Sequence, residues 1–214
     1  MRYPAALLCI VSLFATASRA APEANLLNGR DLPGWEFVAV PAMDLKEVCT
    51  LRPEGVIAIA GKPVGFIATT TSHANYRLHA EWRWPDKPGN SGVLLHISGG
   101  PANGTAWPLC VQLQLKATRV GDLLPMNGAA FAEKLSTPPG AKTPQLDRLA
   151  PDSEKPAGEW NTCDLTCHGD TITVEVNGVR QNTVSRVSPA AGRIGFQLEG
   201  VPFELRSVRL SPLE

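Results

Sequence analysis

The chain has 214 residues, and its 20 Lys and Arg side chains balance 20 Asp and Glu, so the formal net charge is zero. A balanced charge provides no electrostatic attraction for nucleic acid or for an anionic membrane surface, which argues against partners of either kind. The length and the 43% share of hydrophobic residues suit one domain that buries its own core.

Residues 1–20 have the pattern of a secretory signal peptide. Arg2 precedes an apolar stretch that runs to about Phe14, and the small residues Ser18 and Ala20 come before a plausible cleavage point. We therefore expect an exported protein, periplasmic or extracellular, with a single domain over residues 21–214. A buried N-terminal helix is the alternative. No later segment approaches the roughly 18 apolar residues that a membrane span requires.

The expected mature chain retains four cysteines, and export makes disulfides possible. Cys163 and Cys167 lie on one face of an expected strand, about 13 Å apart, which is too far for a bridge. Two fully bridged pairings remain open, as do free thiols buried as small hydrophobic residues. No Cys/His spacing indicates zinc. The four residues are Cys49, Cys110, Cys163 and Cys167.

Short alternating segments separated by Gly, Pro and Asn predict an all-β fold with antiparallel sheets, a sandwich or a barrel. Asn177-Gly178 supplies the two positive φ values of a type I′ turn and predicts a hairpin over 170–184. Long helical periodicity is absent. Strands are expected within 55–61, 65–71, 76–84, 91–99, 110–116, 162–169, 170–179, 193–200 and 203–210.

Residues 117–158 interrupt this pattern with six prolines and little alternation. A short helix is expected at AAFAEKLS, residues 129–136. We interpret the rest as a long connection lying over the sandwich. Such a long connection within a compact domain is usually functional or mobile.

Several expected strands carry a polar face opposite an apolar one, because side chains alternate along a strand. Such a face is either exposed to solvent, as is common in antiparallel sheets, or it forms a binding surface. The Arg, His, Gln and Asn side chains favour binding, since they form directional hydrogen bonds. Three nearby tryptophans, at 82, 84 and 107, would suit a sugar-binding groove. The polar faces are Arg77/His79/Glu81/Arg83, Asn90/Leu94/His96, Gln112/Gln114/Lys116 and Gly195/Gln197/Glu199.

Five blocks of the chain, in this order, resemble the family once called DUF1080 and now named for 3-keto-disaccharide hydrolase activity. The resemblance implies a concanavalin A-like jelly roll of two antiparallel sheets, with the 77–83 polar row on a concave binding face. The blocks are LLNGRDLPGW (26–35), YRLHAEWRWP with NSGVLLHISG (76–99), WPLCVQLQLK with GDLL (107–124), EKPAGEWNTCDLTCHGDTITVEVNGV (154–179) and GRIGFQLEGVPFELRSVRL (192–210).

The resemblance also implies cleavage of glycosides that carry a ketone at C3. The ketone acidifies the C2–H bond, so a base removes that proton, the enolate expels the C1 substituent, and water adds to the unsaturated sugar. This chemistry needs a base near C2, a positive charge or a metal at the enolate oxygen, and a donor for the departing oxygen.

We assign these roles as hypotheses. Glu81 is the first candidate for the base or a metal ligand, and Arg83 holds the enolate or ketone oxygen. His96 is a second acid–base candidate. Asp122 positions a base or a cation, and His79 lies farther along its strand. The residues expected to orient sugar hydroxyls are Asn90, Gln112, Gln114 and Gln197.

Each assignment has a structural alternative. Glu81 and Arg83 would otherwise form a cross-strand ion pair, His96 would be a hydrogen-bonded structural histidine, and Asp122 a turn residue. A divalent cation is possible, although none can be identified from the sequence.

Gln112 departs from the family pattern, because many relatives have a glutamate at this place. An amide cannot ionise or act as a base. A carbohydrate-binding module without catalysis is therefore the main alternative function. A protein-interaction sandwich of the laminin-G kind is the third.

Overall fold

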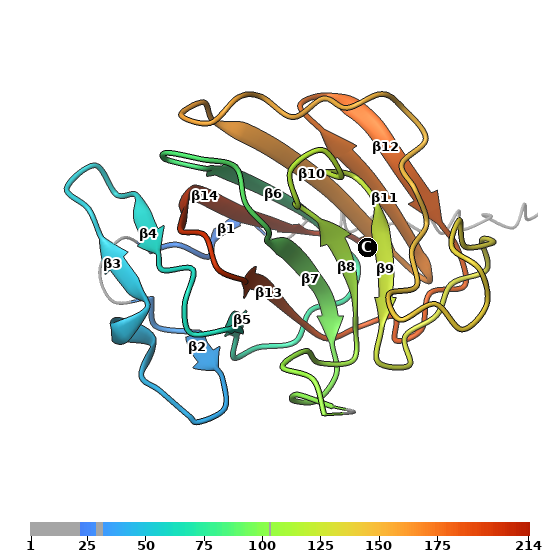
Figure 1. Ribbon diagram of the computed structural model, residues 1–214, viewed down its shortest axis with the longest axis horizontal. Helices are drawn as coiled ribbons and strands as arrows, with labels where there is room; N and C mark the ends of the chain where they lie inside the picture. The colour runs from blue at the N-terminus through green and yellow to red at the C-terminus, as the bar shows by residue number, and fades with distance from the viewer. Residues whose placement is uncertain (1–21, 29–31, 103) are drawn as a thin grey trace, which may run out of the picture.

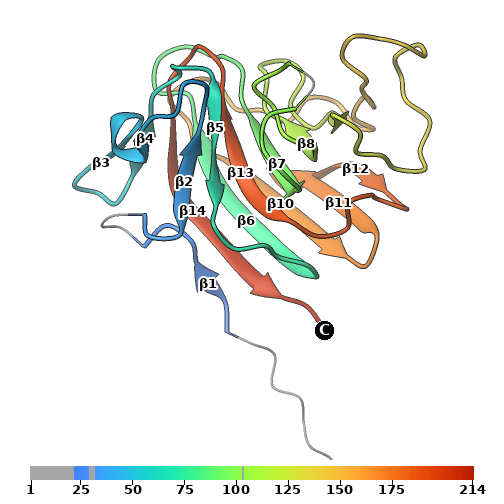
Figure 2. The ribbon, with the colours of Figure 1, turned by 90° about the horizontal axis from the view of Figure 1, so that it is seen from below.

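The computed structural model describes residues 22–28, 32–102 and 104–214. Over these residues the chain forms two antiparallel sheets packed face to face, as Figure 1 and Figure 2 show, and the single helical turn is η1 (Leu45–Glu47). The expected all-β jelly roll is confirmed. The predicted signal peptide lies outside the described residues. Within the described residues no helix is long and apolar enough to span a membrane.

The first sheet, called sheet A, contains the longest strands. Its strands β10, β6 and β14 alternate buried and more exposed residues along most of their length, which is why each presents one apolar side to the core. In spatial order, sheet A consists of β12 (Val179–Val184), β11 (Thr171–Val176), β10 (Asn161–His168), β6 (Tyr76–Arg83), β14 (Phe203–Pro212), β4 (Ile57–Ile59) and β3 (Cys49–Leu51), and β1 (Ala24–Asn25) also pairs with β14.

The second sheet, called sheet B, has six strands and is buried on both faces over most of β5, β7, β8 and β13. Burial of both faces means that something other than sheet A covers its outer side. In spatial order, sheet B consists of β2 (Trp35–Val38), β5 (Gly65–Thr69), β13 (Arg193–Leu198), β7 (Gly92–Ile97), β8 (Cys110–Gln114) and β9 (Leu123–Met126).

The core lies between the sheets. Trp82 and Trp84 from one side and Phe196 and Leu113 from the other belong to one buried apolar cluster. The four described cysteines are free; Cys110, Cys163 and Cys167 are buried, and burial raises the pKa of the half-buried Cys49 thiol to about 12. They therefore act as small apolar residues.

The predicted hairpin is confirmed: β11 and β12 pair around Asn177 and Gly178, with φ values of 50° and 77°. The connection between β9 and β10 runs beside β9 and β12 (Figure 1), where Leu146 bridges Leu123 and the backbone of Leu149 donates to Gln181. The helix expected at 129–136 is wrong. Backbone N–H groups of Ala130 and Ala132 donate to the segment that follows β12 instead.

The sequence pattern assigns the polar row on β6 and the glutamines of β8 to one binding site. This expectation is wrong, because the two groups lie on different surfaces of the sandwich. Trp82 of β6 and Leu113 of β8 both point into the core, so the polar sides of their strands face away from each other on opposite outer surfaces. Parity along one strand identifies a polar face but does not say to which sheet the strand belongs.

Ion pairs occupy the row on sheet A. The Arg83 guanidinium donates from Nε to the buried Glu204 at 2.6 Å and stacks over the Trp160 ring, which Arg206 also covers. Glu81 pairs with Arg206, and His79 with Asp164 at 2.7 Å. Glu81 and Arg83 therefore form cross-strand ion pairs, as the structural alternative expected, but with Arg206 and Glu204 of β14 and not with each other.

Replacing Arg83 with Met should lower the free energy of unfolding by about 1–3 kcal/mol, because it removes a charge-assisted hydrogen bond from a carboxylate with only 1% of its side chain exposed. Glu81→Gln, which breaks a more exposed pair, should cost no more than about 1 kcal/mol. Urea unfolding measures both. Neither variant should change carbohydrate affinity, and a loss of affinity in either would place a binding site on sheet A.

Candidate functional site

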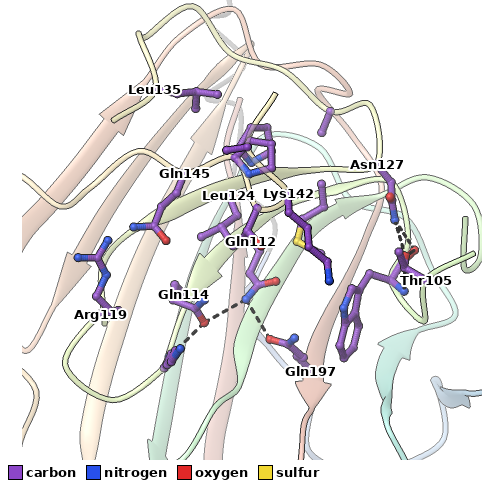
Figure 3. A pocket seen from close by; sticks show the side chains of 18 of the residues that line it. Thr105, Gln112, Gln114, Arg119, Leu124, Asn127, Leu135, Lys142, Gln145 and Gln197 are labelled. Carbon is purple, nitrogen blue, oxygen red and sulfur yellow. Dashed lines mark hydrogen bonds between the residues drawn. The ribbon is translucent and has the colours of Figure 1, made fainter. Parts of the chain in front are cut away.

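A depression of about 850 Å³ lies on the outer face of sheet B. Its floor consists of side chains from β8 and the end of β13, and residues of the connection after β9 cover it (Figure 3). Four of the predicted substrate-binding residues come together here, although they belong to three separate segments: Asn90, Gln112, Gln114 and Gln197.

The floor is held by a chain of amide hydrogen bonds, and Figure 3 draws those that Gln112 Nε2 donates. Gln112 Nε2 donates to Gln197 Oε1 at 2.9 Å and to Gln114 Oε1 at 3.1 Å. Gln114 Oε1 also accepts the backbone N–H of Lys116, and Gln197 Nε2 donates to Glu199 Oε2 at 2.6 Å. These outer partners fix the orientation of both flanking amides, so both hydrogens of Gln112 Nε2 are used.

Two buried acceptors on the depression have no partner within the described residues. Gln112 Oε1 is one of them, and Asn90 Oδ1 is the other. Gly92 makes this position of Gln112 possible, because a Cβ at residue 92 would lie 2.5 Å from Gln112 Nε2. Unpaired buried acceptors are costly, and donors such as sugar hydroxyls would satisfy them.

Glu199 is the one carboxylate among the described residues that line the depression. Its Oε2 accepts from Asn90 Nδ2 at 2.7 Å as well as from Gln197. Burial raises the pKa of Glu199 above that of an ordinary glutamate, and the nearby Lys116 charge opposes the shift. A carboxylate fixed through one oxygen, with the other open, has the geometry of a general base.

Sequence reasoning missed Glu199 as a candidate, although the signal was present. It follows Gln197 by two positions in the β13 alternation and was assigned to the same polar face. Glu81, on the opposite sheet, is the carboxylate that the sequence favours, because its strand carries more ionisable side chains.

Three cationic side chains line the depression, and they differ in the groups with which they interact. Arg119 is committed to Asp122 at 2.8 Å and Asp147 at 2.7 Å. Lys116 acts on Glu199 through its charge. Lys142 belongs to the covering connection, and Figure 3 shows it extending toward the floor.

Asp122 does not line the depression but anchors its cover. The buried carboxylate accepts from Gln145 Nε2 at 3.0 Å and from the Arg148 backbone N–H at 2.8 Å, in addition to Arg119. Burial raises its pKa, and the Arg148 backbone N–H and the Arg119 charge counteract the shift. Asp122 therefore ties the connection to the start of β9, a structural role beyond that of a turn residue.

His96 lies outside the depression because a β-bulge reverses the alternation of β7. Two residues, Leu95 and His96, stand opposite Ile194, and His96 has φ 56°. Its ring packs edge-on against the core residue Tyr76, with 5.9 Å between centroids, and its Nδ1 lies 2.9 Å from the Pro189 carbonyl oxygen. These contacts are those of a hydrogen-bonded structural histidine, and they do not favour the assignment of His96 as an acid–base catalyst.

The side chains that could act as metal ligands give no support for a bound metal ion. No group of three or more His, Cys, Asp or Glu side chains suitable for a metal ion occurs within 22–28, 32–102 and 104–214. Hard divalent cations favour several oxygen ligands with carboxylates among them, and the depression offers one carboxylate with neutral amides.

Several solved structures with the same fold come from carbohydrate-active proteins. A candidate glycosyl hydrolase from Parabacteroides distasonis is 20% identical, with a TM-score of 0.65 over 90% of this chain and 94% of that one. The carbohydrate-binding module CBM66 from Bacillus subtilis is 11% identical, with a TM-score of 0.57 over 82% and 94%. The family GH16 endo-beta-1,3(4)-glucanase SCLam is 12% identical, with a TM-score of 0.59 over 92% and 91%. At these identities the likeness shows the fold alone.

No curated protein was found to match the sequence. A family model does match, and it spans nearly the whole described chain, from residue 22 to residue 211. This agrees with the order of the sequence blocks and with the jelly roll. The chain therefore belongs to the family of the 3-keto-alpha-glucoside-1,2-lyase-like domain.

Proposed function

We propose that this protein cleaves 3-keto-glycosides, including 3-keto-disaccharides, by removing the C2 proton, expelling the C1 substituent and adding water to the unsaturated sugar. The observation that carries the proposal is Glu199, a partly buried carboxylate anchored through one oxygen beside unpaired hydrogen-bond acceptors. Family membership supports the chemistry of the keto sugar. In the same proposal the protein is exported and acts in the periplasm or outside the cell.

Glu199 acts as the base in this scheme. Its Oε2 is held by Asn90 and Gln197, which leaves Oε1 to take the C2 proton. Burial raises its pKa and so makes the carboxylate a stronger base, while two hydrogen bonds keep it oriented. The C2–H electron pair passes to the C3 carbonyl as an enolate.

Two lysines supply the positive charge at the enolate and the proton for the departing oxygen. Lys116 already interacts with Glu199 electrostatically, so it lies close enough to stabilise the enolate that forms beside the base. Lys142 approaches from the covering connection, opposite the strand floor, and we assign it to donate a proton to the departing oxygen. Water then adds oxygen at C1 and a proton at C2.

Gln112 fits this scheme better than a glutamate would. A carboxylate at 112 would face the amide oxygens of Gln114 and Gln197, so both amides would have to turn. Gln197 would then present its oxygen to Glu199 in place of a donor. The neutral amide therefore keeps Glu199 ionised and oriented, while its free oxygen accepts from a sugar hydroxyl.

A carbohydrate-binding module without turnover is the second candidate, and the same neutral Gln112 is the observation that favours it. Gln112→Glu separates the two. If Glu199 is the base, the added charge should raise the Glu199 pKa by about one unit and move the acid limb of kcat/KM to higher pH. If the wild type is inert and Gln112→Glu creates turnover, the binding module is correct and residue 112 is the missing base.

Glu199→Gln tests the enzyme directly. Wild type should release sugar from 3-keto-disaccharides and none from their unoxidised forms, with or without chelator, and Glu199→Gln should lose at least about 100-fold in rate. Sugar release and binding are followed by chromatography and calorimetry. Equal turnover by Glu199→Gln would remove this residue from the mechanism.

The pH profile supplies an independent check. The base must be ionised, so kcat/KM should fall on the acid side with a midpoint above the ordinary glutamate pKa of 4.5. A raised pKa also means that the folded state binds the proton more tightly, so ionised Glu199 reduces stability as the pH rises through the ordinary value. Glu199→Gln should therefore be at least as stable as wild type at pH 7.

A further inference from the structure

We infer that the depression contains a second subsite, next to the amide floor, that accepts a flat aromatic aglycone. The inference rests on the proposed function for the sugar half of the ligand and adds the class of its leaving group. Substrates would then be 3-keto-glucosides of phenols or related aryl groups, in preference to disaccharides.

One wall of the depression is apolar. Trp107 lines it together with Met126 and Pro125 of β9, and Leu124 lies beside Gln112 across the β8–β9 pairing. The connection after β9 adds Leu135 and Pro144 from above. The floor carries amides and a carboxylate, so the two halves of one cavity differ in chemistry.

The polar groups on this wall are already engaged with one another. Thr105 Oγ1 donates to the Ala102 carbonyl at 2.9 Å and accepts from the Trp107 backbone N–H at 3.2 Å. Asn127 Nδ2 donates to the Trp107 carbonyl at 2.6 Å and to Thr105 Oγ1 at 3.1 Å. The unpaired acceptors lie instead at Gln112 and Asn90.

This division favours an aryl group over a second sugar. The hydroxyls of one sugar would find partners on the floor, whereas those of a second sugar would lose water against Leu124, Pro125 and Met126 without compensation. An aromatic ring has no such requirement and gains from stacking on an indole.

Neighbouring residues hold Trp107 in a position where it could stack on an aromatic ring. It packs, together with Met126, on a second apolar cluster on the outer face of sheet B, which contains Phe66, Leu94 and Ile97. Its backbone is fixed by Thr105 and Asn127. The ring is only partly buried and borders the depression, so a fixed aromatic surface remains for a ligand.

The chemistry of the leaving group also favours an aryl aglycone. A phenolate departs with less need for protonation than an alkoxide does, and Glu199 is the single carboxylate among the described lining residues. Expulsion of a phenol transfers the C1–O electron pair to the aryl oxygen, while Glu199 takes the C2 proton and exchanges it with solvent before water adds.

The test compares two substrates of the same anomeric configuration, 4-nitrophenyl 3-keto-glucoside and a 3-keto-disaccharide. Wild type should favour the aryl substrate by tenfold or more in kcat/KM. Trp107→Ala should lower kcat/KM for the aryl substrate by about tenfold and for the disaccharide by less than about threefold. Trp107→Phe should retain most of the preference. Trp160→Ala, which alters a partly exposed tryptophan that stacks on Arg83 and Arg206 of sheet A, is the matched control and should change neither value.

A binding measurement separates this inference from the proposed function. Phenyl glucoside and methyl glucoside lack the ketone, so calorimetry with them does not depend on turnover. Tighter binding of the phenyl ligand, lost in Trp107→Ala with an unchanged urea midpoint, supports the aryl subsite even if no 3-keto substrate is cleaved. Equal affinity for both ligands, or a wild-type preference for the disaccharide, overturns it.

Discussion

The candidate site depends on the hydrogen-bond chain that runs from Lys116 N–H through Gln114, Gln112 and Gln197 to Glu199. Each amide in the chain has its orientation set by the next group, so one carboxylate oxygen is anchored and one amide oxygen remains unpaired. The chain needs a neutral amide at 112 and a glycine at 92 beside it. The neutral side chain at 112 and the strand glycine at 92 thus belong to one arrangement.

The two outer faces of the sandwich show how similar side chains are put to different uses. On sheet A every ionisable group of the 79–83 row has an ionisable partner, with Glu204 held between Arg52 and Arg83. On sheet B the polar groups bond mainly through amides, and two buried acceptors stay unsatisfied. Mutual neutralisation stabilises a surface, whereas unsatisfied acceptors beneath a covering connection favour a ligand.

Alternation and turn residues were sufficient to predict the all-β fold, the hairpin at Asn177 and the polar face that carries Gln112 and Gln197, because these depend on local chain geometry. They did not predict the assignment of β6 to the sheet opposite β8, since pairing partners are set by contacts far apart in the sequence. The bulge at His96 also escaped prediction, because a single extra residue reverses the faces of a strand without a clear sequence signal.

Hydrogen exchange at C2 tests the central claim most directly. A 3-keto-glycoside is incubated with enzyme in D₂O, and the released keto sugar is examined by NMR and mass spectrometry against an enzyme-free sample that measures spontaneous enolisation. The account predicts one deuterium at C2 in each newly released sugar, introduced when water adds after proton removal, and no such product with Glu199→Gln. Release of sugar that retains its original C2 hydrogen would mean direct displacement at C1, and would contradict the account.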